Sequence, residues 1–388
     1  MPAPDMTVGR THVWRPSTIM AWHSARPRPG VGGRPSARDD SSGLTGAAPD
    51  GPRLLILGGT RFVGHAVALA ALSHGWEVST FNRGRSGTDV AGVHVLRGDR
   101  TRAGDLAALA TAGPWDAVID TSGYVPREVL AVCECLQPLA RQYVFMSTVS
   151  VYRGWPSEPL SEASEVLYCP PDAGPDYGED AEDGPTRYGY QKSGCELAVR
   201  STFGEDRSTV LRPGVVVGPR EYVGRLPWWL NRVAAGGRVL APGSPDRSIQ
   251  PVDVRDLAEF AIQSAARDIG GAYNVTAPVG RETFGGMLSA CAEVTGSDAE
   301  FVWVPDEQLL ARGVRQWSEM PLWRTFPGVW QVDSAAAHAR GLPCRPLKVT
   351  VADTWSWMQD GNASLDDVRA GEIGISRERE QQILEYVT

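Results

Sequence analysis

Short apolar runs alternate with longer, helix-like stretches from residue 53 onward. Leu54–Leu57 is continuously apolar, as in a strand buried on both faces of a parallel sheet. The same pattern predicts further strands at 76–81, 93–96, 117–120, 143–146 and 209–211, and helices at 66–73, 105–112, 127–136, 188–202, 226–235 and 252–266. Strands that alternate with helices in this way indicate an α/β fold with a doubly wound parallel sheet.

The alternation stops at residues 153–187, a loop-like stretch with nine acidic residues that we expect to face solvent. From about residue 301 the chain is rich in tryptophan, a residue that more often fills a core than binds a ligand. We therefore expect one domain over 51–220 and a smaller C-terminal lobe over 221–388, with a segment near 247–275 that returns to the first domain. Residues 1–50 combine many prolines and glycines with no apolar period, which predicts a disordered leader.

Composition narrows the class of protein. The net charge of −8 argues against nucleic acid as the main partner. No apolar run is long enough to span a bilayer, so we expect no membrane partner. The six cysteines form no metal-binding or disulfide pattern, which favours a reducing, cytoplasmic compartment and no metal site.

A glycine-rich turn joins the first predicted strand to the first helix. It contains Gly58, Gly59, Thr60, Arg61, Phe62, Val63 and Gly64. Glycines let the backbone turn tightly and approach a pyrophosphate, while the helix amino end supplies N–H donors and a positive dipole. This position in a strand–turn–helix unit predicts that the turn binds NAD or NADP.

The end of the second predicted strand sets the preference between these two cofactors. An acidic residue there would bind the ribose hydroxyl of NAD, but the chain has Asn82 and then Arg83. Arg85 and Arg61 lie nearby in sequence, and a guanidinium binds a phosphate through two charge-assisted bonds. We therefore predict NADP, with NAD as the alternative.

A tyrosine and a lysine lie four residues apart at the start of a predicted helix. The spacing places Tyr188 and Lys192 on one helix face, whereas Tyr190 points elsewhere. An ammonium beside a phenol favours the phenolate, which suits acid–base chemistry at a carbonyl or alcohol. Only Lys192 and Lys348 are lysines among the 38 lysines and arginines, so a lysine at this position marks a candidate site.

Three hydroxyl residues follow the fifth predicted strand, in the segment 145–152 that ends in Val151-Tyr152. Together with the glycine turn and the tyrosine–lysine pair, this segment resembles the extended short-chain dehydrogenase/reductase family, the NAD(P)-dependent epimerase/dehydratase-like group. The resemblance implies a Rossmann-type sheet, with cofactor binding in residues 51–220 and substrate binding mainly in 221–388. It implies that Thr148, or else Ser147 beside it, holds the substrate oxygen, that Tyr188 is the acid/base, and that Lys192 also holds the nicotinamide ribose.

Further cofactor contacts follow from the same resemblance. The matching positions are Asp99, Thr121, Ser122, Gly123, Ser147, Pro213, Val215 and Val216. Arg247 matches an arginine that binds the diphosphate of nucleotide sugars in some members, with Arg220 and Arg225 as alternatives. The chain departs from the family at Arg61, where a glycine is usual. In this respect it is similar to a subgroup with a Gly-Gly-Thr-x-Phe-x-Gly turn. Some members of that subgroup are reported to bind RNA.

Three functions remain open at this point. The first is an NAD(P)(H)-dependent oxidoreductase that acts on a carbonyl or alcohol of a small-molecule, sugar or secondary-metabolite substrate. The second is a nucleotide-sugar epimerase or dehydratase that keeps its cofactor bound. Val149 stands beside Thr148 where a dehydratase tends to carry an acid, which favours the first. The third is a non-enzymatic nucleotide sensor or RNA-binding protein. The family also suggests a homodimer.

Overall fold

The computed structural model describes residues 6–8, 11–13, 51–181, 184–362 and 368–386. The chain divides into two units, Met1–Ala48 and Pro49–Thr388. In the first unit, strands β1 (Met6–Val8) and β2 (Thr11–Val13) form an antiparallel pair. The rest of the predicted disordered leader lies outside the described residues.

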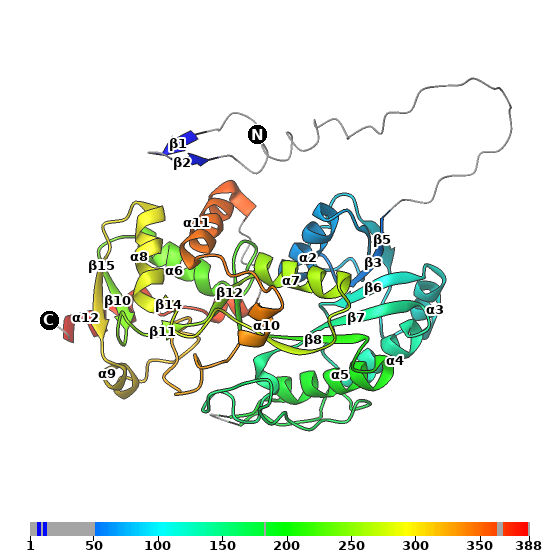
Figure 1. Ribbon diagram of the computed structural model, residues 1–388. Coiled ribbons are helices and arrows are strands. Elements are labelled where there is room, and N and C mark those ends of the chain that lie inside the picture. Colours follow the sequence, from blue (N-terminus) through cyan, green and yellow to red (C-terminus); the bar gives the residue numbers. More distant parts are fainter. Residues whose placement is uncertain (1–5, 9–10, 14–50, 182–183, 363–367, 387–388) are drawn as a thin grey trace, which may run out of the picture. The chain divides into compact units, whose positions relative to one another are not determined.

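A seven-stranded parallel sheet forms the centre of the second unit (Figure 1). Its strands, in spatial order, are β13 (Gly271–Val275), β8 (Ser208–Pro213), β7 (Ala140–Met146), β6 (Trp115–Asp120), β3 (Arg53–Leu57), β4 (Glu77–Asn82) and β5 (His94–Arg97). From β3 the chain adds strands toward one edge of the sheet, and from β6 it adds them toward the other edge. Ligands of doubly wound sheets bind at such a switch point, outside the carboxyl ends of the strands. The predicted Rossmann-type fold is confirmed.

Helices cover both faces of this sheet. On one face lie α2 (Phe62–Ser73) and α7 (Val254–Ala266), and on the other α3 (Ala103–Thr111), α4 (Pro126–Leu136) and α5 (Arg187–Phe203) (Figure 1). The alternation within the central strand explains this layering: Leu54 and Ile56 join the first hydrophobic cluster, whereas Leu55 and Leu57 join the second. All four side chains are fully buried, as the continuous apolar run predicts.

Strand ends that carry polar side chains extend beyond their predicted limits. β8 continues through Arg212, which is 2% exposed, because the buried Glu196 of α5 neutralises its guanidinium at 2.6 Å. β7 begins at Ala140 rather than at Tyr143, because the buried Gln142 donates a hydrogen bond to Thr209 on the neighbouring strand. Apolar periodicity alone misses such paired polar positions.

The C-terminal lobe is built from short sheets and helices around its own core. Its strands form the pairs β9 (Val215–Val217) with β12 (Pro251–Asp253), β10 (Arg238–Pro242) with β15 (Glu300–Val304), and β11 (Ser248–Ile249) with β14 (Glu282–Thr283). Its helices are α6 (Arg225–Ala234), α8 (Phe284–Thr295), α9 (Asp306–Ala311), α11 (Leu347–Trp357) and α12 (Arg377–Tyr386), and the short α10 (Ala335–Ala339) packs near β13. Trp229 and Trp323 are fully buried in this core. Among the described residues, no helix has both the length and the apolar character that crossing a bilayer would require.

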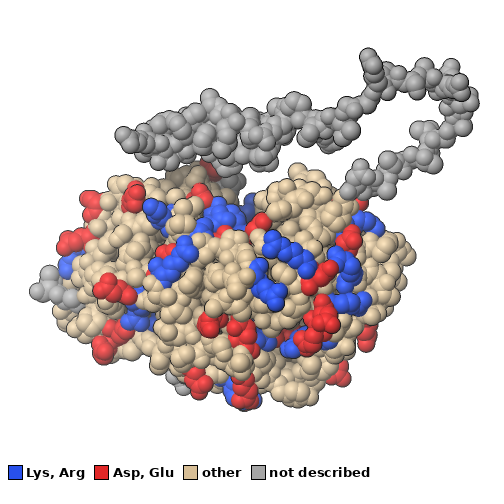
Figure 2. All heavy atoms as spheres, viewed as in Figure 1, with Lys and Arg blue, Asp and Glu red and all other residues tan. Residues whose placement is uncertain are grey.

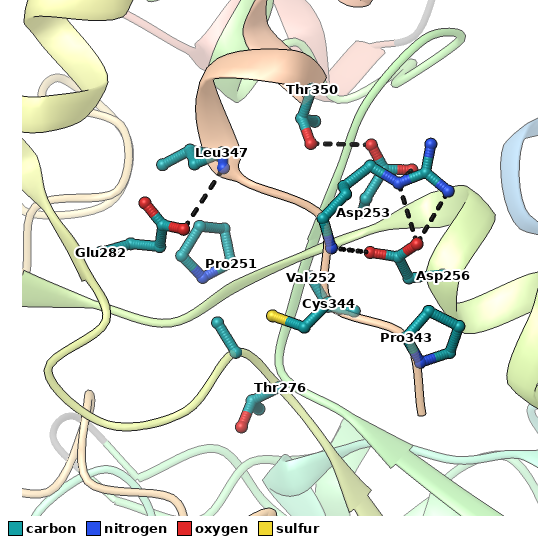
Figure 3. A pocket seen from close by; sticks show the side chains of 12 residues that line it. Pro251, Val252, Asp253, Asp256, Thr276, Glu282, Pro343, Cys344, Leu347 and Thr350 are labelled. Carbon is teal, nitrogen blue, oxygen red and sulfur yellow. Dashed lines mark hydrogen bonds and ion pairs between the residues drawn. The ribbon is translucent and has the colours of Figure 1, made fainter. Parts of the chain in front are cut away.

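An ion-pair network ties helix α11 to the amino end of α7. Asp253 caps α7 by accepting from the Arg255 backbone, and it also accepts from the Thr350 hydroxyl at 2.7 Å. Asp256 accepts from the backbone and the guanidinium of Arg345. These groups surround a hollow of about 10 Å³, too small for more than one water molecule (Figure 3). The network is therefore structural.

Replacing Asp253 tests the strength of this network. Burial opposes its charge, but hydrogen bonds and the charges of Arg255 and Arg345 outweigh burial and lower the pKa of Asp253. Because its pKa is lower in the folded state, ionised Asp253 stabilises the fold at pH values above the unfolded-state pKa of about 3.9. This stabilisation is lost as the pH falls through the folded-state pKa. We expect Asp253→Asn to reduce the free energy of urea unfolding by about 3 kcal/mol at pH 7, and by progressively less below pH 4.

The exposed Asp246 provides the control, because Asp246→Asn should leave the unfolding free energy within about 0.5 kcal/mol of the wild type. A destabilisation by Asp253→Asn that is equally large at pH 7 and pH 3 would contradict the electrostatic explanation.

Candidate functional site

A cavity of about 1030 Å³ opens at the carboxyl edge of the sheet. It lies where the glycine turn, the end of β7, the start of α5 and the β8–β9 connection meet the C-terminal lobe. Of the site residues predicted from sequence, those that line it are Phe62, Val63, Thr121, Ser147, Thr148, Tyr188, Lys192, Pro213, Val215 and Val216. Residues predicted from five separate segments are thus brought together in one space.

The glycine turn brings α2 against the first strand. Gly59 has a φ of +100°, which side-chain-bearing residues rarely adopt. A Cβ on Gly64 would lie 2.7 Å from the Gly59 nitrogen, so only glycine permits this close approach. No side chain caps the amino end of α2, and its first turn carries no acidic residue. The turn and the helix dipole therefore provide a place that favours an anion.

Asn82 holds the loop after β4 instead of facing outward. Its amide donates to the Gly58 carbonyl and to Asp89, while its oxygen accepts from the Gly84 backbone and from Arg97. Both lone pairs of the Asn82 oxygen are used by these two contacts, so the side chain is occupied in shaping this loop.

Arg97, which was not predicted from the sequence, donates a hydrogen bond to the Asn82 oxygen. The parallel register places it directly beside Asn82 at the end of β5, and this register is the signal that could have found it. It is also paired with Asp89. Arg83 is more exposed and lies 4.0 Å from Asp99. Hydrogen bonds from the Thr101 backbone and hydroxyl lower the pKa of Asp99, so the Asp99 carboxylate mainly fixes its own turn.

A fully buried carboxylate, also missed from sequence, supports the strand end next to the cavity. Asp120 at the end of β6 receives two hydrogen bonds from the Arg100 guanidinium, at 2.9 and 3.0 Å, and one from the Tyr143 hydroxyl. Although burial raises the pKa of Asp120, the charge and hydrogen bonds of Arg100 outweigh it and lower this pKa. Arg100 also donates to the Ser122 hydroxyl, which keeps the predicted Ser122 side chain in the wall and out of the cavity lining.

Lys192 is held between two strand ends. Its ammonium donates to the carbonyls of Gly123 at 2.8 Å and Met146 at 2.5 Å. An ammonium has three donors, so one N–H is left for a group inside the cavity that Lys192 lines. Burial lowers the pKa of Lys192, while the nearby charges of Asp120 and Glu196 raise it. Gly123 thus serves the site through its carbonyl.

The two hydroxyl candidates after β7 have different partners. Ser147 donates at 2.5 Å to Glu196, the buried partner of Arg212. Thr148 accepts from the Ser150 backbone and contacts the Ser150 hydroxyl at the surface of the cavity. Ser147 is therefore committed to a buried ion pair, whereas Thr148 is the hydroxyl better placed to receive a ligand.

Helix α5, which carries Tyr188, lies very close to the turn that follows β7. A Cβ on Gly189 would lie 2.2 Å from the Ser150 carbonyl oxygen. Tyr188 is 45% exposed and lines the cavity together with Lys192, one helical turn further along α5. Tyr190 instead packs edge-on against Tyr177 and lies outside the cavity lining.

The far end of the cavity is aromatic and basic. Trp317 lies under the guanidinium groups of Arg225 and Arg324, whose centres are 4.8 and 4.6 Å from the ring. Arg315 and Phe326 line the same end. The arginine that sequence matching favoured, Arg247, is not in this lining, because its guanidinium pairs with Asp306 and donates to the Arg324 carbonyl.

The described acidic residues of the loop 153–187 do not line the cavity. Two of the arginines at its far end face carboxylates, Arg225 near Glu221 at 3.9 Å and Arg315 near Glu319 at 3.6 Å. Every acidic residue of 153–187 that the structure describes is exposed except Glu162, which is half-buried and accepts from the Asn274 backbone. Figure 2 shows acidic and basic side chains interspersed over the visible face. In the described part of the chain, no cluster of three or more His, Cys, Asp or Glu side chains could hold a metal ion.

A nicotinamide dinucleotide fits the groups that are present. The tight turn, which exposes the amino end of α2, exists only because Gly59 and Gly64 lack a Cβ, which would collide with Thr80 and with the turn itself. The buried Lys192 offers a donor to a ribose. The volume exceeds the 300–1,000 Å³ of ordinary small-ligand pockets, which leaves room for a substrate beside part of a cofactor.

Comparison with known proteins identifies relatives of this chain. The sequence profile of the NAD dependent epimerase/dehydratase family matches residues 54–276. A chloroplast stem-loop binding protein of 41 kDa from Arabidopsis thaliana is 28% identical over 263 residues, which are 63% of each chain. The chain therefore spans less than two thirds of that relative.

Several solved structures share the fold. WbmG of Bordetella bronchiseptica in complex with NAD matches with a TM-score of 0.60 and 18% identity, over 81% of this chain and 96% of that one. UDP-glucose 4-epimerase of Thermotoga maritima with UDP-glucose matches with a TM-score of 0.60 and 17% identity, over 80% and 100%. At this level of identity, the likeness shows the fold alone and leaves the chemistry to the site.

The approach at Gly189 can be tested by adding one methyl group. In a free helix, Gly→Ala stabilises by about 1 kcal/mol, but here the methyl would collide with the Ser150 carbonyl. We expect Gly189→Ala to lower the free energy of unfolding by about 1–3 kcal/mol and to weaken binding of NADPH. Urea unfolding and a fluorescence titration measure the two effects.

Gly104 of α3 is the matched control, because a Cβ there would meet nothing within 4 Å. Gly104→Ala should leave cofactor binding unchanged and raise stability slightly. If both variants behave alike, the close approach at Gly189 has no importance for the site.

Proposed function

Because the chain belongs to the NAD dependent epimerase/dehydratase family, we propose that it oxidises and reduces a hydroxyl-bearing carbon of a small substrate with the help of NAD(P). The observation that carries the proposal is the meeting of Thr148, Tyr188 and Lys192 in one cavity with the glycine turn. Bound nicotinamide would supply or accept the hydride. Everything else in the reaction falls to side chains of this chain.

Tyr188 is the proposed acid/base and Thr148 the group that orients the substrate oxygen. The Thr148 hydroxyl can rotate away from Ser150 and donate to that oxygen, while the Tyr188 phenolate takes the alcohol proton. Lys192 contributes a fixed positive charge one helical turn away, which favours the phenolate. Its two carbonyl partners keep the ammonium in place throughout the reaction.

The basic far end points to an anionic substrate. Arg225, Arg315 and Arg324 beside Trp317 suit a phosphate-bearing, ring-containing group at one end while the reacting carbon lies at the other. A nucleotide-linked sugar has this chemistry. We propose an epimerase-type reaction, in which the carbon is oxidised and then reduced again, as the first candidate.

An oxidoreductase with net turnover of NADP(H) is the second candidate. Val149 beside Thr148 offers no carboxylate for dehydration, and the arginines after β4 suit an exchangeable NADP. Binding of a nucleic-acid stem-loop, suggested by the name of the Arabidopsis relative, is supported less well, because that function has no need of the tyrosine–lysine pair.

The acid/base role of Tyr188 can be tested by removing its hydroxyl. Tyr188→Phe removes the proton carrier and keeps the ring, so we expect conversion of UDP-glucose or UDP-N-acetylglucosamine to fall by at least about 100-fold. NADPH affinity should change by less than about twofold. Proton NMR of the sugar, with cofactor absorbance recorded in parallel, distinguishes epimerisation from net oxidation or reduction.

Tyr190→Phe is the control on the same helix and should retain full conversion, since Tyr190 lies outside the cavity lining. Undiminished conversion by Tyr188→Phe would overturn the proposed mechanism. Stem-loop binding without any conversion by the wild type would favour the RNA-binding alternative.

The preference for NADP over NAD can be tested at Arg83. We propose that Arg83 contacts the 2′-phosphate of NADP at the end of β4, where its charge is only partly matched by Asp99 at 4.0 Å. Arg83→Ala should weaken NADPH binding by about tenfold and leave NADH binding nearly unchanged. Arg153→Ala, which removes an exposed arginine of the acidic loop, should alter neither. Equal weakening of both cofactors by Arg83→Ala would contradict this role.

A further inference from the structure

The segment 218–224 runs from β9 to α6 along the edge of the cavity. Three of its residues, Gly218, Arg220 and Gly224, have φ values of +135°, +73° and +82°. Its backbone is thus folded into a specific shape, which costs energy at Arg220 in particular. Glu221, Tyr222 and Val223 of this segment all line the cavity.

One end of the segment is fixed to the C-terminal lobe. Glu221 is 1% exposed, and its carboxylate accepts from the backbones of Arg225 and Leu226 at 2.9 and 3.2 Å. It thereby caps the amino end of α6. The segment cannot shift at this point without uncapping a buried helix end.

The middle of the segment contacts the glycine turn, whose Phe62 also lines the cavity. The Arg61 guanidinium lies over the Tyr222 ring at 4.6 Å from its centroid, and the Phe62 ring meets Tyr222 edge-on at 6.3 Å. One turn further along α2, burial and the nearby charge of Arg220 lower the pKa of His65 to about 4, so His65 packs there as a neutral ring. The segment therefore spans from the C-terminal lobe to α2.

Arg61 is also bounded on its other side. A Cβ on Gly87 would lie 2.7 Å from the Thr60 carbonyl and 3.8 Å from the Arg61 side chain, so the loop after β4 packs directly on the turn. Arg61 stands at the N-cap position of α2, where the helix dipole is positive and no acidic residue follows. The positive end of the helix dipole repels the Arg61 guanidinium. An anion bound between Arg61 and the helix end would attract both.

From these contacts we infer that Arg61 and Tyr222 form a latch that retains the dinucleotide cofactor. The cation–π contact joins the pyrophosphate-binding turn to a segment anchored in the other lobe, so the cofactor can leave only after the contact opens. This role rests on the cofactor binding proposed above and adds to it: the residue at the usual middle-glycine position slows release of the cofactor. A cofactor held in this way suits an oxidation that is reversed on the same molecule.

Release kinetics test the latch directly. NADPH bound to the purified full chain is chased with excess NADP⁺, and loss of tryptophan-to-nicotinamide energy transfer is followed in a stopped-flow instrument. We expect Tyr222→Leu and Arg61→Gln each to speed release by about 5- to 30-fold, the range of a partly desolvated cation–π contact. Tyr222→Phe keeps the ring and should release NADPH at nearly the wild-type rate.

The double variant separates a latch from two independent contacts. If Arg61 and Tyr222 act through one another, the double variant should release NADPH at most about twofold faster than the faster single variant. Tyr168→Ala, which removes an exposed tyrosine outside the cavity lining, should have no effect. Thermal unfolding of each variant shows whether the fold is preserved; if Tyr222→Leu does not fold, the comparison of Arg61→Gln with the wild type carries the test.

Wild-type release rates in Arg61→Gln and Tyr222→Leu, or fully additive effects in the double variant, would overturn the latch while leaving the proposed function intact. Failure of the wild type to bind NADPH or NADH at all would overturn both. Slow release that depends on both residues supports the latch.

Discussion

The candidate site depends on one close approach, that of helix α5 to the turn after β7. Gly189 permits it, because any Cβ would lie 2.2 Å from the Ser150 carbonyl oxygen. This contact places Tyr188 and Lys192 in the same cavity as Thr148, although they are about 40 residues apart in sequence. The proposed chemistry thus depends on how closely the backbone of α5 approaches the turn after β7.

Buried charges hold the surrounding strand ends in position. Asp120 with Arg100 fixes the end of β6, and Gly123, three residues further along the chain, supplies a carbonyl to Lys192. Glu196 with Arg212 ties α5 to β8 and takes up the Ser147 hydroxyl. Such pairs gain little net stability, but removing one partner leaves a buried charge uncompensated, so they specify one arrangement of the edge.

Much of this arrangement could be predicted from the sequence, because strand–turn–helix periodicity and the motif spacings are local. The sheet, the glycine turn and the Tyr188–Lys192 helix follow from such patterns. The pairing of Arg247 with Asp306 could not be predicted, since Asp306 comes from helix α9 in another part of the chain. The basic far end of the cavity likewise joins Arg225 to Trp317 and Arg324 from distant segments. A pattern along the sequence contains no information on which long side chains from distant segments contact one another.

The most direct test of the central claim is an equilibrium titration of the purified chain with NADPH and with NADH, followed by energy transfer from tryptophan to the nicotinamide. The cavity that joins the glycine turn to Thr148, Tyr188 and Lys192 predicts saturable binding of one cofactor molecule per chain. Cofactor that is already present after purification, at the same stoichiometry, would agree with this prediction. The absence of binding by either cofactor to protein free of bound nucleotide would contradict the account.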